Sequence, residues 1–516
     1  MHNQQADWRG SLRSFAHPRV VSMLFFGFSA GIPLLLIFSS LSLWLREAGV
    51  ERSAVTYFSW AALAYSFKFL WAPLVDQLPL PFLTKKLGRR RAWLLLSQCS
   101  IVLSIVLIAL IDPSKENALT TMALAVVLLG FSSATQDIAI DAYRIESASS
   151  DLQALMSSTY IAGYRIGMLS SGAGALFLAS GFGSSMESYS YEAWMFTYII
   201  MSLTMLVGLV TTLIVSEPVS AELRAKRDYS SVQYLRFLAM FAMSICIFVG
   251  VYIVGADQVE QLKRDVGSYA GNEALANFSI ECLRLIFAVL IVCFFIRLVS
   301  FTSMYEHQLI QDSYISPVKE FFSRYGIRLA VLLLVFVGFY RVSDIVLGVI
   351  SNVFFQDMGF SKTEIASVVK TFGLFMTILG GFLGGVLSVR FGVIKMLYAG
   401  AFLTVATNLL FMLLAKTGYD IELLYLVISA DNLTAGLASA AFIAFLSSLT
   451  NVSFTAVQYA IFSSLMTLLP KVIGGYSGSM VDNLGYSNFF LVASMMGVPV
   501  LYLIYRIQKH DTFKNL

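Results

Sequence analysis

The sequence predicts an all-α integral membrane protein made of two six-helix halves with two extra helices between them. Three observations predict this class. The chain has 516 residues, of which 58% are apolar and only 13% are charged, a balance that does not suit a water-soluble domain. Apolar runs long enough to cross a bilayer recur along the chain, and a pattern near its start returns in its second half. We therefore expect a multi-pass membrane protein.

The apolar runs form groups of six, two and six, about fourteen membrane helices in total. Each is about 20 residues long, as a helix must be to cross roughly 30 Å of hydrocarbon. The predicted helices lie near 20–45, 53–75, 92–112, 118–143, 154–180, 193–215, 233–254, 280–300, 327–356, 362–388, 391–414, 421–447, 453–476 and 484–507. This grouping predicts a cytoplasmic N-terminal segment 1–19, a six-helix bundle 20–215, a central insertion 216–326, a second six-helix bundle 327–507 and a cytoplasmic tail 508–516.

The central insertion is the least regular part of the pattern. Its stretches 255–279 and 301–326 are amphipathic, and we expect them to be loop-like. Arg284 and Arg297 flank a run of only about 12 apolar residues, which is short for a crossing. One of the two extra helices could therefore lie in the membrane interface instead of spanning the bilayer.

Lys and Arg are distributed unevenly between the links. The link between the second and third predicted helices carries Lys85, Lys86, Arg89, Arg90 and Arg91, whereas links on the other side of the membrane carry fewer. Positively charged links stay in the cytoplasm, so an even number of crossings places both termini there. The net charge of +4 is too small to indicate a nucleic-acid partner.

The two six-helix groups share sequence patterns. LWLREAGVERSAVTYF resembles VFFQDMGFSKTEIASV about 310 residues later, with Gly49 matching Gly359. The link that begins at Asp76 and continues through LGRRR corresponds to GGVLSVRFGVIK, where Ser388 stands in place of the acid. Two parallel six-helix halves resemble the transporters of the major facilitator superfamily. That resemblance implies a gating role for the link, whose residues are Asp76, Gly88, Arg89, Arg90 and Arg91, here with an insertion, QLPLPFLTKK.

Ionisable side chains at membrane depth cost several kcal/mol or more, so each is a candidate functional residue. The fourth predicted helix contains ATQDIAIDAYRIE, in which Asp137, Asp141 and Arg144 share one stripe at helical spacing, with Gln136 beside them. We expect Asp137, the deeper acid, to be the first candidate for proton coupling and Asp141 the second. Asp141 and Arg144 could instead form a structural pair or a gate at the cytoplasmic end.

Two predicted helices of the first half also carry a cation beside a tyrosine. Lys68 has Tyr65 one turn away, and Arg165 has Tyr164 beside it. A buried cation needs an anion, which either an aspartate of the fourth helix or a substrate carboxylate could supply. For Arg165, a structural link between the fourth and fifth helices is an equally good reading.

The second half repeats this pattern of polar residues. Its first helix contains Tyr340, Arg341 and Asp344, and its fourth contains Asp431 and Asn432. We predict substrate contacts for ten residues of the two halves: Lys68, Tyr65, Gln136, Tyr164, Arg165, Tyr340, Arg341, Asp344, Asn432 and Gln458. A single Gln in a membrane helix more often joins helices than binds a ligand, so the structural reading is favoured for Gln458.

Several stretches together resemble the AmpG-type muropeptide permeases, a branch of the major facilitator superfamily. They are GFSAGIPLLL, YSFKFLWAPLVD, LGRRRAWLLLSQ, ATQDIAIDAYRIE, GYRIGMLSSGAGALFLA, DNLTAGLASAAFIAFLSSLTN and SFTAVQYAIFSSL, which cover both halves outside 216–326. The resemblance implies proton-driven import of N-acetylglucosaminyl-1,6-anhydro-N-acetylmuramyl peptides from periplasm to cytoplasm across the bacterial inner membrane. It also implies a role in peptidoglycan recycling and, indirectly, in β-lactamase induction.

Alternative functions have weaker support. Acetyl-CoA transporters share the fold and the acidic fourth-helix motif, but they would need a cluster of basic residues for the phosphates. A polytopic membrane transferase would need a catalytic group and a donor-binding loop, and no histidine lies in a predicted membrane helix. The four cysteines have no short paired spacing, so no metal site is predicted. We therefore expect a monomeric transporter, not an enzyme, that uses the proton gradient and no cofactor.

Overall fold

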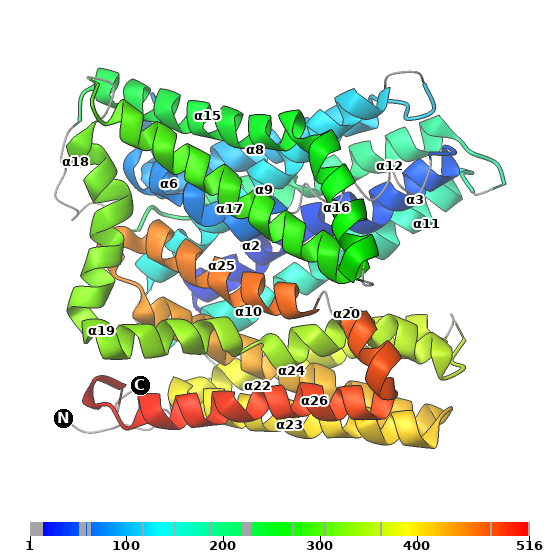
Figure 1. Cartoon of the computed structure of the whole chain (residues 1–516). Coiled ribbons are helices and arrows are strands. Elements are labelled where there is room, and N and C mark those ends of the chain that lie inside the picture. Colours follow the sequence, from blue (N-terminus) through cyan, green and yellow to red (C-terminus); the bar gives the residue numbers. More distant parts are fainter. Residues whose placement is uncertain are drawn as a thin grey trace. The chain divides into compact units, whose positions relative to one another are not determined.

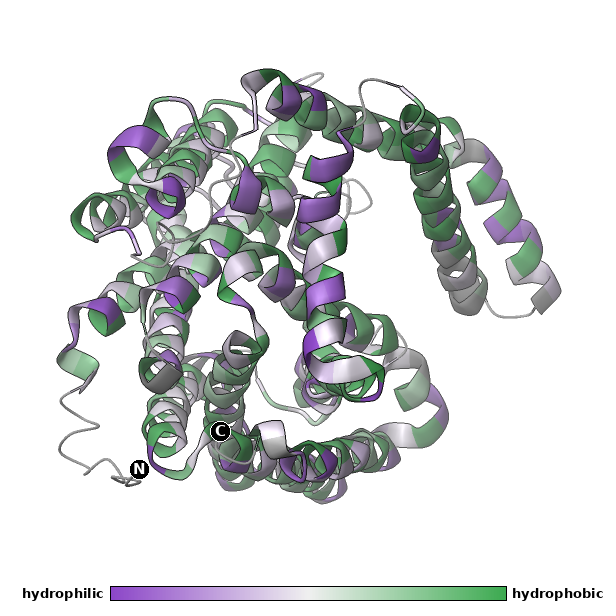
Figure 2. Cartoon of the chain, turned by 90° about the vertical axis from the view of Figure 1, so that its left-hand side faces the viewer, coloured by the Kyte–Doolittle hydropathy of each residue, from purple (hydrophilic) through white to green (hydrophobic). Residues whose placement is uncertain are grey.

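A computed structural model describes residues 14–50, 58, 63–115, 118–148, 150–185, 187–218, 229–270, 273–302, 306–361, 364–474 and 477–513, and within these ranges the regular structure is all helical (Figure 1). Among these residues, twelve helices are long and apolar enough to cross a membrane. Hydrophobic residues dominate the ribbon in Figure 2. The predicted class, an all-α membrane protein, is confirmed.

The twelve helices correspond to twelve of the predicted fourteen. Of the other two, the segment near 53–75 lies mostly outside the described residues. The segment near 154–180 folds as α10 (Ser150–Leu169), the π-helical turn η5 (Ser170–Gly174) and α11 (Ala175–Gly181), but its helix is not among those twelve. The total of fourteen therefore stays a prediction.

The chain divides into two compact units, Met1–Arg224 with Phe321–Leu516, and Ala225–Glu320. The first unit holds both six-helix groups. Its N-terminal half comprises α2 (Pro18–Leu35), η2 (Leu36–Ser40), α3 (Leu41–Glu47), α5 (Leu63–Phe67), η4 (Lys68–Leu70), α6 (Ala72–Gln77), α7 (Leu83–Leu87), α8 (Arg89–Ala109), α9 (Ala118–Ser147), α10, η5, α11, α12 (Tyr191–Thr204) and α13 (Leu206–Ile214). Its C-terminal half comprises α19 (Ser316–Phe339), α20 (Val342–Asp357), η7 (Ile365–Phe372), α22 (Gly373–Phe391), α23 (Val393–Thr417), α24 (Ile421–Leu449), α25 (Thr455–Gly474) and α26 (Ser477–Gln508).

The second unit contains α15 (Ser231–Val254), α16 (Ala256–Ala270), α17 (Glu273–Val299), α18 (His307–Ile310) and η6 (Gln311–Ile315). The loop-like structure expected for 255–279 is wrong over α16, which is a regular helix with one apolar and one polar face. Lys263 of α16 pairs with Glu281 of α17 at 2.8 Å, so these two helices are held together by an ion pair.

Several membrane helices are interrupted near their middle. The helix formed by α5 and α6 is broken at η4, which begins with Lys68. The first helix of the C-terminal half breaks between α19 and α20, where Arg341 is the N-cap residue. Interrupted helices place backbone and side-chain polar groups at membrane depth, and transporters of this general kind build their binding sites from them.

The α2–α10 contact depends on glycine. A Cβ atom on Gly163 of α10 would lie 1.9 Å from the carbonyl oxygen of Leu24 on α2, which is far inside contact distance. Only glycine allows the two backbones to approach this closely, as in other small-residue packing motifs of membrane helices. The contact holds α10 against α2, and it thereby positions Arg165, which follows Gly163 by two residues.

Candidate functional site

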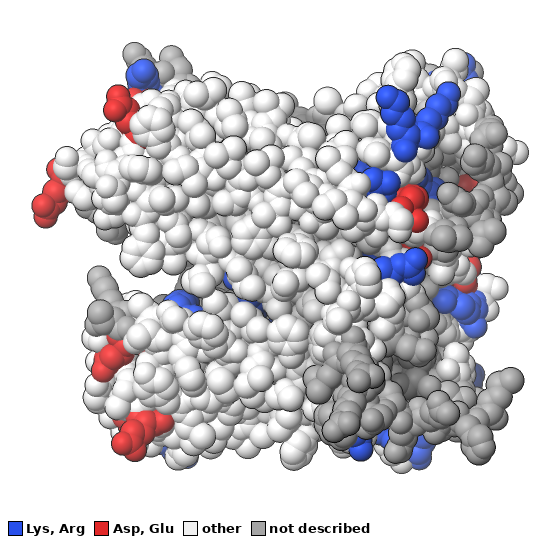
Figure 3. Space-filling view, turned by 180° about the vertical axis from the view of Figure 1, so that it is seen from behind, with Lys and Arg blue, Asp and Glu red and all other residues white. Residues whose placement is uncertain are grey.

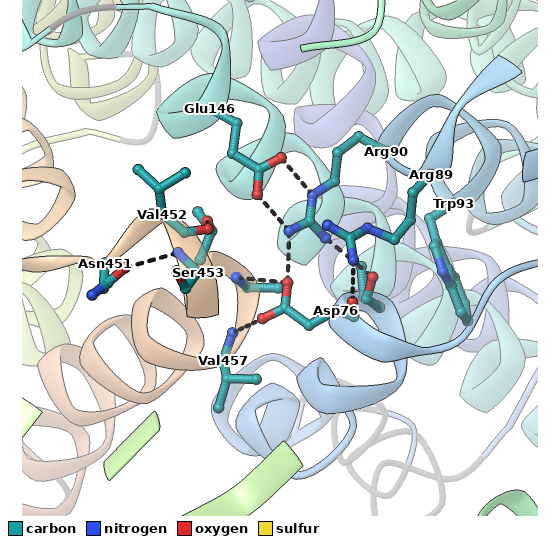
Figure 4. A network of polar contacts seen from close by, with 12 residues as sticks. Asp76, Arg89, Arg90, Trp93, Glu146, Asn451, Val452, Ser453 and Val457 are labelled. Atoms are coloured by element: carbon teal, nitrogen blue, oxygen red, sulfur yellow. Dashed lines mark hydrogen bonds and ion pairs between the residues drawn. The ribbon is translucent and has the colours of Figure 1, made fainter. Parts of the chain in front are cut away.

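A buried ion network lies where the link between α6 and α8 meets α9 (Figure 4). Arg90 is fully buried, and its guanidinium lies 2.6 Å from Asp76 Oδ1 and 2.6 Å from Glu146 Oε1. Arg90 Nη1 also donates to the carbonyl of Val75 at 3.1 Å. Each buried charge therefore has an opposite partner, the condition under which a buried ion pair is tolerated.

Asp76 also connects the two halves of the protein. Its carboxylate oxygens accept hydrogen bonds from the backbone N–H groups of Ala456 at 3.3 Å and Val457 at 3.0 Å. These groups lie in the first turn of α25, where unpaired N–H donors and the helix dipole favour an anion. Asp76 is thus bound both to Arg90 in its own half and to a helix end in the other half (Figure 4).

The neighbouring residues of the link support α8. Arg89 donates to the carbonyl of Asp76 at 2.5 Å, and Arg91 donates to the carbonyls of Thr212 and Leu213 at the end of α13. Glu217 accepts from the backbone N–H groups of Arg90 at 2.8 Å and Arg91 at 3.1 Å. Burial raises the pKa of the Glu217 carboxyl, and the two N–H donors oppose that rise. The predicted gating residues of the link therefore lie together, whereas Arg144, also a candidate gating residue, bonds to Asp141 and Ser447 outside this network.

Gly88 is required at the start of α8, and its replacement gives a testable prediction. Its φ is +86°, and a Cβ atom there would lie 2.4 Å from the Glu217 side chain. Gly49 has nearly the same φ, +83°, with no atom within 4 Å of its Cβ position. We expect Gly49→Ala to cost only the left-handed strain of about 1–2 kcal/mol, and Gly88→Ala to lower the unfolding temperature further. Equal unfolding temperatures for the two purified variants would show that the Glu217 contact has no energetic weight.

A second chain of charges runs through the first half at membrane depth. Asp141 lies between two cations, with Lys68 Nζ at 3.7 Å and Arg144 Nη2 at 3.2 Å. Arg144 also donates to the hydroxyl of Ser447 on α24 at 2.7 Å, and its guanidinium lies over the ring of Tyr459 on α25. Lys68, Asp141 and Arg144 therefore form one chain, with the Asp141–Arg144 pair that the helical spacing predicts, and this chain reaches into the C-terminal half.

Asp137 lies one turn from this chain and forms no ion pair with a described residue. It is only 8% exposed, and its Oδ1 atom has no hydrogen-bond partner. Lys68, Asp141 and Tyr160 are near enough to interact with it electrostatically. Gln136 is fully buried, and neither atom of its amide group has a partner. Unpartnered buried polar groups are unusual and indicate a ligand, a proton or water as the missing partner.

Tyrosines of three helices, α5, α10 and α25, lie near this acid. The Tyr65 hydroxyl lies 2.5 Å from Ser133 Oγ, and both Tyr65 and Tyr164 are near enough to Asp137 to interact with it. Tyr160 and Tyr164 contact each other, with ring centroids 6.0 Å apart. The structure therefore brings Tyr65, Tyr164 and Asp137 together.

The second half contributes a charged group of its own. Arg341 pairs with Asp344 at 2.5 Å, and both side chains are just over a quarter exposed. Arg165 of α10 lies near this pair but forms no hydrogen bond or ion pair with a described residue, so it does not tie α10 to α9. Asp431 contacts only the Thr407 hydroxyl, at 3.5 Å, and also lies near Asp344.

Three predicted binding residues have other roles in this structure. Tyr340 donates to the Leu397 carbonyl and stacks on Phe442 in the hydrophobic core. Asn432 accepts from Thr377 Oγ1 at 2.9 Å, which joins α24 to α22. Gln458 accepts from the Asn451 N–H at 2.7 Å and from Arg324 at 3.3 Å, which supports the structural reading of this residue.

Four further residues of the site are absent from the sequence-based set. Glu146 is the second carboxylate of Arg90, and Glu217 caps α8. The other two are Lys370, which donates to the side chain of Asn352, and Lys471, which donates to the hydroxyl of Ser66. Glu146 follows Arg144 inside an apolar helix and could have been noticed as an ionisable residue, as could the two lysines. Glu217 gives no such signal, because it lies in a polar link.

Comparison with known proteins decides the family. The chain is 30% identical over 490 residues to AmpG 4 of Rickettsia conorii, covering 95% of this chain and 96% of that protein. This chain belongs to the AmpG family of transporters. It is also 26% identical over 494 residues to the anhydromuropeptide permease of Escherichia coli K12, covering 96% of this chain and 80% of that protein. A family model described as acetyl-coenzyme A transporter 1 matches residues 20–230.

Solved structures show the same fold. The proton:xylose symporter XylE superposes with a TM-score of 0.58 at 12% identity, covering 96% of each chain. The fucose transporter FucP, in an outward conformation, gives a TM-score of 0.59 at 12% identity, covering 97% of this chain and all of that one. The protein therefore has the major facilitator superfamily fold and is a multi-pass membrane transporter, not an enzyme.

Proposed function

We propose that this transporter imports 1,6-anhydro-N-acetylmuramyl peptides from the periplasm into the cytoplasm, driven by protons. The observation that supports this best is the buried acid Asp137, which has no ion-pair partner and lies beside the chain Lys68–Asp141–Arg144. A carboxyl group in this position can take up a proton, and the adjacent lysine can receive a substrate carboxylate. The family membership supports the substrate class. Such import would serve peptidoglycan recycling and, indirectly, β-lactamase induction.

The proposed mechanism is alternating access of the two halves. The links rich in Lys and Arg face the cytoplasm in this proposal, with both termini on that side of the inner membrane. The contacts of Asp76 with α25 and of Arg144 with Ser447 then close the cytoplasmic end. Figure 3 shows a hollow between the two halves at the opposite end, where few Lys and Arg gather. This arrangement corresponds to an outward-open state of the transporter.

The proton and the substrate compete for the same electrostatic partner in this scheme. While Asp137 is ionised, it and Asp141 both attract Lys68. Protonation of Asp137 removes one negative charge and leaves Lys68 free to bind the carboxylate of a substrate. Release of the proton toward the cytoplasm restores the competing carboxylate and expels the substrate. The proton gradient would thus supply the energy, with no cofactor.

Acetyl-CoA transport is the second candidate, because the family model that matches residues 20–230 carries that description. Binding of the coenzyme A phosphates would need a cluster of basic residues, and in the sequence these residues are scattered. In the structure, Arg165 of α10 and Arg341 at the start of α20 lie near each other although they are far apart in sequence. An anionic solute other than a muropeptide therefore remains a specific rival.

Uptake into proteoliposomes tests the proposal. Purified protein is reconstituted, and labelled anhydro-muropeptide is supplied with and without an inward proton gradient, with acetyl-CoA as the comparison solute. We expect accumulation of the muropeptide above its external concentration only with the gradient. Accumulation of acetyl-CoA alone would assign the second function and reject the first.

A further inference from the structure

The membrane-spanning helices of the two halves contain more basic than acidic groups. Among the described residues, we define the central charged set as ten ionisable side chains of these helices, of which Arg144 and Lys471 lie in the last turns of α9 and α25: Lys68, Arg144, Arg165, Arg341, Lys370, Lys471, Asp137, Asp141, Asp344 and Asp431. Its six basic groups exceed its four carboxylates. Lys68, Arg144 and Arg341 each form an ion pair with a carboxylate of the set.

Three cations of this set have no carboxylate partner among the described residues. Lys471 donates only to the hydroxyl of Ser66, at 3.3 Å. Lys370 donates only to the side-chain carbonyl of Asn352, at 2.9 Å. Arg165 has no hydrogen bond at all within the described part of the chain. Lys370 and Lys471 are exposed and Arg165 is partly buried. A cation of a membrane helix that has no anion partner normally lines a water-filled cavity, so these three are candidate ligand contacts.

The contact of Lys471 places it between the two halves, and the contact of Lys370 places it beside α20. Lys471 lies on α25 of the C-terminal half, and Ser66 lies on α5 of the N-terminal half, two residues before Lys68. Asn352 follows Arg341 by eleven residues, about three helical turns, so Lys370 is held on the face of α20 that carries Arg341. Figure 3 shows Lys and Arg side chains within the hollow between the halves.

We propose that Lys370, Lys471 and Arg165 form an anion-binding path that selects solutes carrying at least two separated negative groups. The inference rests on the proposed transport function and deepens it, because it names the charge class of the substrate. The Lys68 position would receive one anionic group, and Lys471 and Lys370 the others, nearer the open end. The carboxylates of a muropeptide peptide and the phosphates of coenzyme A share this chemistry.

The charge balance agrees with such a solute. With every group ionised, the central charged set carries a net charge of +2, since six cations face four carboxylates. If Asp137 and Asp431, which lack ion-pair partners, each take up a proton, the net charge becomes +4. Protonation therefore strengthens the attraction for a multiply charged anion, and a singly charged solute gains less from it.

Binding measurements on the purified full-length protein test the path. The probes are the anhydro-disaccharide tripeptide, the anhydro-disaccharide without peptide, which has a single carboxylate, and acetyl-CoA. The variants are Lys370→Gln, Lys471→Gln and the double variant, with Lys471→Arg as the charge-preserving comparison and Lys395→Gln as an exposed control at the start of α23. Thermal unfolding without ligand confirms that each variant is folded.

We expect each Gln variant to raise the Kd of a multiply charged probe about tenfold, as for the loss of one charge-assisted contact. The Kd of the singly charged disaccharide should change by less than about twofold. Lys471→Arg and Lys395→Gln should bind like the parent protein. If only acetyl-CoA binds, with the same lysine dependence, the path is supported while the muropeptide proposal fails. Equal weakening of singly and multiply charged probes, no effect of the lysines, or no binding of any probe would overturn the path.

Discussion

Replacing Asp137 by Asn should abolish proton-driven accumulation of substrate while exchange of substrate across the membrane continues. Asn has the shape of a protonated Asp, so Lys68 would stay available for the substrate, but no proton could be carried. We expect accumulation in proteoliposomes with an inward proton gradient to fall to the level of passive equilibration. Counterflow of labelled against unlabelled substrate should keep at least about half of its rate, because the uncharged Asn holds the site in the form that binds substrate.

Asp482→Asn is the matched control for this experiment. Asp482 lies on α26, is exposed, and has no ion pair with a described residue. The same change of a carboxylate to an amide there should leave both accumulation and counterflow intact. Undiminished accumulation by Asp137→Asn would remove this residue from the proton pathway, and attention would then pass to Asp141.

Replacing Arg90 by Ala should destabilise the protein more than any other single change in the gate. Arg90 is fully buried between Asp76 and Glu146, so its loss leaves two carboxylates without their cation. Removing one partner of a buried ion network typically costs about 3–5 kcal/mol. We expect a large drop in the unfolding temperature in detergent, together with loss of transport.

Two further variants separate the buried charge from the basic link as a whole. Lys85→Gln removes a positive charge from α7, where the side chain is exposed, and should leave the unfolding temperature unchanged. Arg90→Lys keeps the charge but cannot bond both carboxylates in the same bidentate way, so it should fall between the parent protein and the Ala variant. A stable Arg90→Ala protein would mean that Asp76 and Glu146 are neutral in this state.

Much of the helical framework could be predicted from the sequence, because crossing a bilayer requires a long apolar run that is visible without a structure. The sequence repeat between the two halves is also visible in the backbone conformation. Gly49 and Gly359 both adopt positive φ values, +83° and +89°, at equivalent helix exits. The helix α16 was missed because it carries polar residues on one face and follows an apolar run directly.

The candidate site could be predicted only as a set of separate residues. The spacing of Asp141 and Arg144 on one helix predicted their pair, and it is present. The connection of Arg144 to Ser447 joins residues 303 positions apart, which helical spacing cannot reveal. Tyr340 and Gln458 have residue types common in binding sites, but packing and a loop contact account for them here.

In the C-terminal half, Asp76 is bound by backbone N–H groups and not by a side chain. The donors are the N–H groups of Ala456 and Val457, which any residue except proline possesses. The two sides of this closure are therefore under unequal constraint: the hydrogen bonds restrict the identity of the acid, whereas packing, and not the hydrogen bonds, restricts the buried positions that receive it. Covariation between the halves would consequently leave this contact undetected, although it spans 380 positions of sequence.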